Sequence, residues 1–235
     1  MSENQTSVTP RLVEQFVMSV LPIMPFECEP WLKEKHYARR TCPISYAFGA
    51  YRDGELIGIV TYGTPASSTL LRGVCGEEWK DKVLELNRLC CENTKNMASW
   101  LVGQSLRMLP KPSVVVSFAD TGQGHVGYVY QATNFLYTGL STKFRDPKVK
   151  GLEHQHHATY GHGKSYKQMR EEYGDKLYFV DRSRKHRYIF FCGSKTQKQQ
   201  MMKDLKYQIQ GYPKGDSKRY DAGGKVETQG ILFAT

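Results

Sequence analysis

The sequence predicts a mixed α/β (α+β) protein in which helices flank a mixed central sheet and a basic hairpin-helix extension follows. Two β-rich runs within residues 46–62 meet at Asp53-Gly54, and an Asp-Gly pair between such runs is the strongest local signal of a hairpin. A strand, a helix and a second strand follow over residues 82–118, which is the order of a βαβ unit. From Lys143 onwards the chain becomes strongly basic.

The N-terminal part is expected to be helical. Residues 11–21 carry apolar side chains at helical spacing, and Pro22 and Pro25 would end that helix. Residues 29–40 predict a second short helix or helix-loop, which contains the adjacent pair His36-Tyr37.

The βαβ unit has clear local signals. Residues 82–91 predict a short apolar strand, and Thr94 or Asn96 can cap a helix that runs to about Leu109. The β-branched residues 113–118 predict a strand that is buried on both faces. The next helix opens at residues 122–127 and is expected to turn four side chains inward: Val126, Val129, Tyr130 and Thr133. Chemistry in such a unit is expected at the carboxyl ends of the strands.

The basic extension is expected to contain a hairpin and a helix. Residues 177–192 predict two strands around a basic tip at residues 182–187. Ser194 to Gln197 form a capping box, which predicts a helix start. That helix is expected to turn Met201, Leu205 and Ile209 inward and Lys198, Lys203 and Lys206 outward.

Length and composition indicate a globular protein. The chain has 235 residues, 40% of them hydrophobic, which suffices for a core without metals or disulfides. Only residues 1–8 have the composition of a disordered segment. No apolar run reaches the roughly 20 residues that span a bilayer, so we expect a soluble intracellular protein without a membrane partner. The six cysteines include no C-x-x-C pair and are expected to be reduced and mostly buried.

The excess positive charge lies in one part of the chain. Residues 143–220 contain 19 Lys and Arg against 8 Asp and Glu, a net charge of +11, whereas the remainder has 14 against 15, a net charge of −1. A basic block interleaved with aromatic residues predicts a polyanion partner, most simply nucleic acid. A solvated basic surface that serves solubility is the alternative.

Two segments resemble the GNAT acyltransferase fold. The run AFGAYRDGELIGIVTYG (residues 47–63) is similar to its paired second and third strands. The run GHVGYVYQATNFLYTG (residues 124–139) is similar to its tyrosine-bearing helix, with Asn134-Phe135 in place of the usual Gly-Phe.

A closer resemblance is to the Mom family of bacteriophage DNA-modification proteins, which are themselves GNAT-like. It rests on five short motifs that together span most of residues 30–210: His36-Tyr37, LNRL with Arg88, PSVVVSFADTGQGHVGYVYQATNF, EHQHHATYGHG and HRYIFFCGSKTQKQQM. The resemblance implies an enzyme that adds a methylcarbamoyl or acetamido-type group to adenine N6 in phage DNA and so protects it from host restriction. It also implies double-stranded DNA as partner, acetyl-CoA and iron as cofactors, and the cytoplasm of the infected bacterial host as location.

The active-site residues that correspond by motif are His36, Tyr37, Arg88, Asp120 and Tyr130. Tyr130 would protonate a departing thiolate, although it also lies on the apolar face of its helix and can be a core residue. Asp120 can equally form an Asx-turn or a helix cap. His36, Asp120 and Tyr130 together offer nitrogen and oxygen ligands that suit iron.

Coenzyme binding is expected where the strand at residues 82–91 leads into the next helix. A helix N-terminus there can hold a pyrophosphate through backbone N–H groups, although a simply capped core helix is the alternative. The turn lacks the Gly-rich pyrophosphate loop of ordinary GNAT enzymes. The residues predicted to contact acetyl-CoA are Leu89, Cys90, Cys91, Lys95, Asn96 and Ser99.

DNA binding is expected to combine stacking and phosphate contacts, because an enzyme that attacks adenine N6 must take the base out of the duplex. Tyr37, Tyr160 and Tyr166 are the candidate stacking residues. Arg182, Arg184, Lys185 and Arg187 are the candidate phosphate contacts. A second histidine group is expected to form a loop at the DNA or the active site, with metal binding or a plain exposed loop as alternatives: His154, His156, His157 and His162.

The expected organisation is an N-terminus at residues 1–8, a GNAT-like core at 9–142, a basic DNA-binding extension at 143–220 and a tail at 221–235. Two other functions stay open: a GNAT acetyltransferase that acts on tRNA or protein, and a nucleic-acid-binding protein without activity on the same scaffold. The oligomeric state is left open, with a homodimer as one option.

Overall fold

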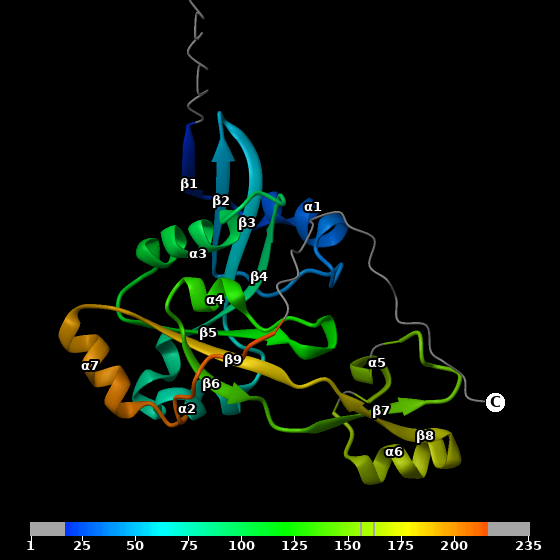
Figure 1. Cartoon of the computed structure of the whole chain (residues 1–235). Helices are drawn as coiled ribbons and strands as arrows, with labels where there is room; N and C mark the ends of the chain where they lie inside the picture. The colour runs from blue at the N-terminus through cyan, green and yellow to red at the C-terminus, as the bar shows by residue number, and fades with distance from the viewer. Residues whose placement is uncertain (1–16, 156, 162, 216–235) are drawn as a thin grey trace, which may run out of the picture.

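The computed structural model describes residues 17–155, 157–161 and 163–215. Its main feature is a seven-stranded sheet in the order β1-β2-β3-β4-β5-β9-β6, accompanied by a separate two-stranded sheet of β7 and β8 (Figure 1). All pairs in the large sheet are antiparallel except β4 with β5, which are parallel. The mixed sheet predicted from the sequence is therefore confirmed.

The first half of the large sheet is a meander. Strands β2 (Tyr46–Arg52) and β3 (Glu55–Gly63) form the predicted Asp53-Gly54 hairpin, with Asp53 and Gly54 both at positive φ. Strand β4 (Val83–Cys91) pairs with β3. Helix α2 (Ser68–Cys75) and a 3-10 turn, η2 (Glu77–Lys82), connect the two.

The predicted βαβ unit is confirmed. Strand β4 leads into helix α3 (Met97–Met108) and then into strand β5 (Ser113–Asp120), which pairs in parallel with β4. A 3-10 turn, η3 (Thr121–Gln123), and the short helix α4 (Tyr128–Ala132) follow, and then strand β6 (Leu136–Leu140).

Two N-terminal predictions are corrected. Residues 18–22 form strand β1 (Met18–Pro22), which pairs with β2, and not the end of a helix; residues 11–16 lie outside the described part. A short apolar run in the sequence does not distinguish a strand from a helix. Here the segment forms a strand because the edge of β2 offers it backbone hydrogen-bond partners. The second helix begins earlier than predicted, as α1 (Pro25–Pro30), and continues as a π-turn, η1 (Trp31–Lys35), that ends just before His36.

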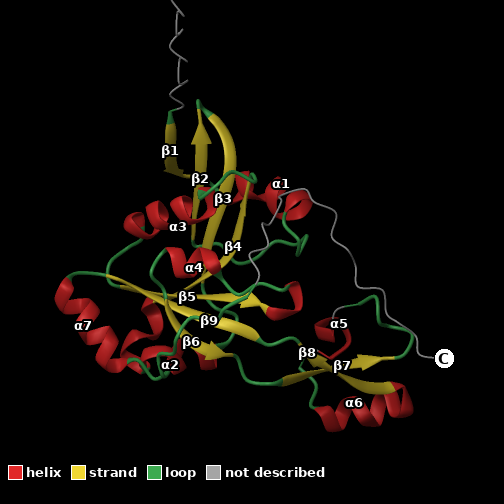
Figure 2. Cartoon of the chain, in the orientation of Figure 1, coloured by secondary structure: helices red, strands yellow, loops and turns green. Residues whose placement is uncertain are grey.

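The basic extension differs most from its prediction. Strands β8 (Leu177–Arg182) and β9 (Lys185–Cys192) do not pair with each other: β8 pairs with β7 (Phe144–Val149), whereas β9 lies between β5 and β6 in the large sheet. Figure 2 shows the small sheet beside the main body, with helices α5 (His157–Gly161) and α6 (Tyr166–Tyr173) around it. The turn η4 (Gly174–Lys176) leads from α6 into β8. Part of the predicted extension thus completes the core sheet.

Helix α7 (Lys195–Asp204) begins with the predicted capping box of Ser194 and Gln197. Met201 is buried as predicted. The helix ends at Asp204, however, so Ile209 lies beyond it and is 46% exposed rather than turned inward.

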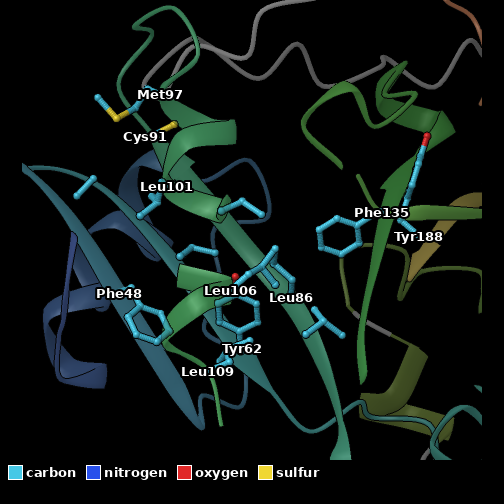
Figure 3. Close-up of a cluster of buried hydrophobic side chains, with 14 of the residues drawn as sticks. Phe48, Tyr62, Leu86, Cys91, Met97, Leu101, Leu106, Leu109, Phe135 and Tyr188 are labelled. Atoms are coloured by element: carbon cyan, nitrogen blue, oxygen red, sulfur yellow. The ribbon is translucent and has the colours of Figure 1, made fainter. Parts of the chain in front are cut away.

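The core lies on both faces of the large sheet. Helix α3 packs against one face through Met97, Leu101 and Leu106, which meet Phe48 and Tyr62 of the sheet (Figure 3). Helices α2 and α7 cover the other face of β5 and β9, where Val114 and Val116 are fully buried. Side chains alternate between the faces along β5, since Val115 belongs to the α3 side. All six cysteines are free and five are buried, in agreement with the prediction. None of the described helices is long and apolar enough to cross a membrane.

Candidate active site

Strands β4 and β5 separate halfway along their length. They are paired only from Val83–Val114 to Leu86–Ser117, although β4 continues to Cys91 and β5 to Asp120. At the last pair, the Ser117 hydroxyl donates to the Leu86 carbonyl at 2.9 Å. Beyond it, the strands run in clearly different directions (Figure 1). We refer to this place, beyond Leu86 and Ser117, as the strand divergence.

The five residues predicted for the active site meet at the strand divergence. Arg88 comes from β4, Asp120 ends β5, Tyr130 lies on α4, and His36 and Tyr37 follow η1. Electrostatic interactions connect His36 with Arg88, and Tyr37 with Arg88, Asp120 and Tyr130. Their separation in the sequence does not reveal this convergence; the sheet order produces it.

Tyr130 is placed by the turn that precedes its helix. Gly127 has φ +82°, and a Cβ there would lie 2.5 Å from the Tyr188 ring, so the turn requires glycine to bring α4 this close to β9. The Tyr130 ring lies 5.4 Å from the Phe135 ring and 5.2 Å from the Tyr188 ring, centroid to centroid. Burial raises the pKa of Tyr130 to about 12, while a hydrogen bond with Ser117 acts in the opposite direction. The phenol is therefore protonated at neutral pH.

His36 is buried and neutral. It is 4% exposed, and its Nδ1 accepts a hydrogen bond from the Ala38 N–H at 3.1 Å. Burial first, and then the charge of Arg88, lower the pKa of His36 to about 4. Its ring lies 4.4 Å from the Tyr37 ring, which in turn meets the edge of His125 at 6.1 Å.

Arg88 holds an unused hydrogen-bond donor. One terminal nitrogen, Nη1, donates to the Asn87 carbonyl at 2.7 Å. The Nε of Arg88 is buried and has no hydrogen-bond partner among the described residues. Buried donors are nearly always satisfied in folded proteins, so an orphaned guanidinium N–H indicates a ligand at this position.

Asp120 has a structural role as well as a position in the site. Its Oδ1 accepts from the Gly122 N–H at 2.8 Å and from the Ser183 hydroxyl at 2.7 Å, and its Oδ2 lies 3.7 Å from the Lys185 ammonium. Asp120 therefore forms the Asx-type turn that was its structural alternative, and it also lies at the strand divergence.

Two further residues of the site were missed by the sequence analysis. Glu85 of β4 interacts with Arg88, Lys185 and Tyr130, and burial raises the pKa of its carboxyl. His125 interacts with His36 and Tyr37. Glu85 and Arg88 are three residues apart and would point to opposite faces of a regular strand. A β-bulge at Asn87, where the pairing shifts from Leu86–Tyr62 to Arg88–Thr61, brings them to the same side.

The residues predicted for acetyl-CoA fall into two groups. Cys90 and Cys91 are 0% and 7% exposed and belong to core clusters, so only their backbone can contact a coenzyme. Asn96 is the N-cap of α3 but gives no side-chain cap, and the Ser99 hydroxyl donates to the Asn96 carbonyl at 3.0 Å. The exposed Lys95 precedes this turn. The N-terminus of α3 and the edge of β4 after Leu89 thus suit a phosphate-bearing ligand.

Iron binding by His36, Asp120 and Tyr130 stays a prediction. Within the described part of the chain, no three His, Cys, Asp or Glu side chains are grouped for a metal ion. The Arg88 guanidinium lies beside His36, and the Lys185 ammonium lies beside Asp120. A metal cation would have to approach against both charges.

The predicted phosphate contacts are mostly engaged within the protein. Arg182 forms a bidentate pair with Asp146, with an Nε to Oδ2 distance of 2.9 Å. Arg184 donates to the Ser141 carbonyl at 2.7 Å. Arg187 donates to the hydroxyl and the carbonyl of Thr138, and it stacks on Tyr207 at 3.4 Å from the ring centroid. These cations do not project together from a hairpin tip, because β8 and β9 belong to different sheets.

The three candidate stacking residues lie in different parts of the structure. Tyr37 lies at the strand divergence, and Tyr166 is 51% exposed beside Phe179. Tyr160 is 7% exposed and packs with Val149 and Met169, so it is a core residue of the small sheet and cannot stack on a base.

The second histidine group cannot be followed as a whole. His154 is exposed, and its Nε2 lies 3.2 Å from the side-chain Nε2 of Gln155. His156 and His162 lie outside the described residues, and His157 begins α5.

The fold and the site define a mixed α/β protein with a polar cluster where two parallel strands part. The chain belongs to the Mom protein family, which it matches over residues 18–214. It is 31% identical over 115 residues to the methylcarbamoylase mom of Escherichia phage Mu, a match that covers 46% of this chain and 48% of that relative, about half of its length.

Similar folds occur among solved acetyltransferases. A GNAT family acetyltransferase from Bacillus cereus is 11% identical, with a TM-score of 0.39, over 74% of this chain and 97% of that chain. A GNAT family acetyltransferase from Elizabethkingia anophelis with acetyl-CoA bound is 10% identical, with a TM-score of 0.37, over 74% of this chain and 97% of that chain. Similarity at this level says nothing about activity.

Proposed function

We propose that the chain is a GNAT-type transferase that modifies N6 of adenine in DNA with a methylcarbamoyl or acetamido-type group. The modification would protect phage DNA from restriction in the cytoplasm of the infected host. The observation that carries the proposal is the cluster of His36, Tyr37, Arg88, Asp120 and Tyr130 at the strand divergence. Membership of the Mom family and the name of the phage Mu relative, a methylcarbamoylase, support transfer of such a group.

Tyr130 serves as the proton donor. Its pKa of about 12 keeps the phenol protonated, and it lies beside Ser117 at the last residue pair before the strands separate. A thiolate that leaves in this position would take up the phenolic proton, which is typically worth 10²- to 10⁴-fold in rate.

Glu85 serves as the proton acceptor for the exocyclic amine. Burial raises its pKa, so the carboxylate is a stronger base than one in water. His36 is suited to a different task, because its pKa of about 4 leaves the imidazole neutral and able to hold the substrate by a hydrogen bond.

Acetyl-CoA is the proposed donor, and when bound it supplies an acyl group activated as a thioester. The backbone of Leu89 to Cys91 and the first turn of α3 would hold it, with Lys95 near its phosphates. Simple acyl transfer gives an N6-acetyl product, so the identity of the product distinguishes this route from one that yields a methylcarbamoyl group.

Adenine would enter the site flipped out of the duplex. Tyr37 offers an aromatic face at the strand divergence, and the orphaned Nε of Arg88 offers a donor to an acceptor atom of the base or of the coenzyme. The exposed Tyr166 at the start of α6, beside the small sheet, is a further stacking candidate.

The test is mass spectrometry of nucleosides from bacteria that express the protein. We expect a modified deoxyadenosine with the wild type and its loss with Asp120→Ala. Asp181→Ala is the matched control, because Asp181 is an exposed carboxylate on β8 whose partner is Arg145 at 3.3 Å, and it should leave the product unchanged.

A wild type that produces no modified deoxyadenosine would contradict the proposal. Acetylated tRNA or protein in the same cells would then support the alternative acetyltransferase. Unmodified nucleic acid and protein would support a binding protein without activity.

A further inference from the structure

We infer that a second surface, away from the strand divergence, holds the phosphate backbone of the DNA. This surface consists of α3 from Ser99 onwards, the Lys111 loop and the outer side of α7, and we call it the α3–α7 surface; at Ser99 it adjoins the place proposed for the coenzyme. The inference rests on the proposed function for the identity of the nucleic acid, and it differs from the prediction that residues 182–187 make the phosphate contacts.

The surface contains two adjoining hollows. One, of about 480 Å³, lies between α3, the end of α4 and β9, with Gly103, Arg107, Lys111, Asn134 and Lys198 among its lining residues. The other, of about 850 Å³, lies along α7 and is lined by Gly193, Lys195, Lys198, Gln199, Met202 and Lys203. Gly193 and Lys198 belong to both, so the two hollows form one continuous track.

The track is cationic, with Asp204 of α7 as an acidic neighbour of Lys203. Arg107, Lys111, Lys195, Lys198 and Lys203 line it, and none of its lining residues is Asp or Glu. The carboxylate of α7, Asp204, lies outside the track and is held by the Trp79 indole N–H at 2.8 Å. Within the described residues, the five cations form no ion pair, so their charge is available to a polyanion.

The small sheet behaves differently although its sequence is also basic. Arg145 pairs with Asp181 at 3.3 Å and Lys164 with Glu172 at 2.6 Å, and Arg182 pairs with Asp146. These cations are neutralised locally. The α3–α7 surface, by contrast, gathers five cations along one track, and this concentration of charge favours it for the DNA backbone.

Gly103 is a second, independent observation. It lies in the middle of α3, where glycine is less favourable than alanine, and a Cβ at this position would meet nothing within 4 Å. No packing within the described fold requires a glycine here. A bare helix surface between Arg107 and Lys198 lets a sugar-phosphate backbone approach closely.

The surface lies near enough to the proposed site to act on the same DNA molecule. Asn134, which lines the track, follows the end of α4, and Tyr130 lies on that helix four residues earlier. A backbone held on the track would therefore run beside the helix that carries Tyr130 and could present a neighbouring flipped base at the strand divergence.

The experiment measures binding of a short labelled DNA duplex by fluorescence anisotropy over a series of salt concentrations. The variant is Lys198→Glu with Lys203→Glu, and the control is Lys150→Glu with Lys176→Glu, which makes the same charge change at exposed positions of the small sheet. We expect the α7 variant to bind at least roughly tenfold more weakly and its log-log salt slope to fall by about 2, since each phosphate contact contributes about 0.9. The control should retain the wild-type slope.

A further variant, Gly103→Gln, fills the track without changing the charge and should also weaken DNA binding several-fold. Equal binding by the α7 variant and the control would overturn the inference. Loss of coenzyme A binding with unchanged DNA binding, measured by titration calorimetry, would also overturn it and assign the track to the coenzyme.

The nucleoside measurement separates this inference from the proposed function. If the wild type produces no modified deoxyadenosine but DNA binding depends on Lys198 and Lys203, the surface is supported and the chemistry is wrong. If modified deoxyadenosine forms and the α7 variant binds DNA as tightly as the control, the chemistry is supported and the surface is wrong.

Discussion

The two halves of the β4–β5 strand pair differ in what they do. From Val83 to Leu86 the strands are paired, and their neighbours are buried apolar side chains such as Val115. Beyond Leu86 they part, and the ionisable side chains of Arg88 and Asp120 take the place of the apolar ones, with Glu85 of the paired half near the boundary. One pair of strands thus provides stability at one end and reactive groups at the other. Substitutions at the open end should therefore lower activity with little effect on stability, and substitutions at the paired end should do the opposite.

The largest effect is expected at the open end. Tyr130→Phe removes the phenolic proton donor but retains the ring that packs on Phe135 and Tyr188. We expect the rate of DNA modification to fall by about 10²- to 10⁴-fold with a nearly unchanged melting temperature. Steady-state kinetics and thermal unfolding would check this. A normal rate would show that Tyr130 is a packing residue.

The paired end should give the opposite result. Val115 is fully buried on the α3 side of β5, so Val115→Ala removes two methyl groups from a closed core. We expect the free energy of unfolding to fall by roughly 2 kcal/mol, from the lost transfer free energy and the cavity, with little change in activity of the folded fraction. Denaturant unfolding measures the first quantity. A large loss of activity in the folded fraction would contradict the division between the two ends.

A third prediction concerns the pH dependence at the open end. The pKa of His36 is about 4 in the folded protein and about 6.5 in the unfolded chain, so the unfolded state binds the proton more readily below pH 6.5. This group therefore contributes stability above pH 6.5 that is lost as the pH falls towards 4. The loss between pH 8 and pH 5 should be roughly 2 kcal/mol in wild type relative to His36→Gln. If the free energy of unfolding depends on pH in the same way in both proteins, His36 is not buried in its neutral form.

The smallest effect is expected at the boundary between the halves. The Ser117 hydroxyl donates to the Leu86 carbonyl at 2.9 Å and interacts with Tyr130. Ser117→Ala leaves that carbonyl unsatisfied, which typically costs about 1 kcal/mol or somewhat more. Because the bond to Tyr130 is lost as well, both stability and activity should decline modestly. If only stability declines, Ser117 belongs to the paired half; if only activity declines, it belongs to the open half.

Local signals in the sequence predicted the local structure. The hairpin at Asp53-Gly54, the capping box of Ser194 and the order of β4, α3 and β5 depend on neighbouring residues, and all three are confirmed. Tyr130, which the motif placed in the site, lies at the strand divergence, and its role stays a prediction.

Features that depend on distant pairing were not predictable in this way. The first strand forms because β2 has a free edge, and β9 joins the large sheet because β5 and β6 leave a place between them. Glu85 escaped notice because its orientation depends on the bulge at Asn87, and a bulge of one residue reverses the side-chain alternation. The burial of Tyr160 likewise depends on a small cluster that its own segment does not reveal.

The insertion of β9 beside β6 has a consequence for how the chain is assembled. Leu140 of β6 pairs with His186 of β9, and the Ser141 N–H donates to the Lys185 carbonyl at 2.8 Å. The chain therefore leaves the large sheet and returns to it at adjacent points, and the small sheet with α5 and α6 is a cassette between them. A short turn could bridge these two points. The cassette could thus be exchanged or deleted while the seven-stranded sheet keeps its register.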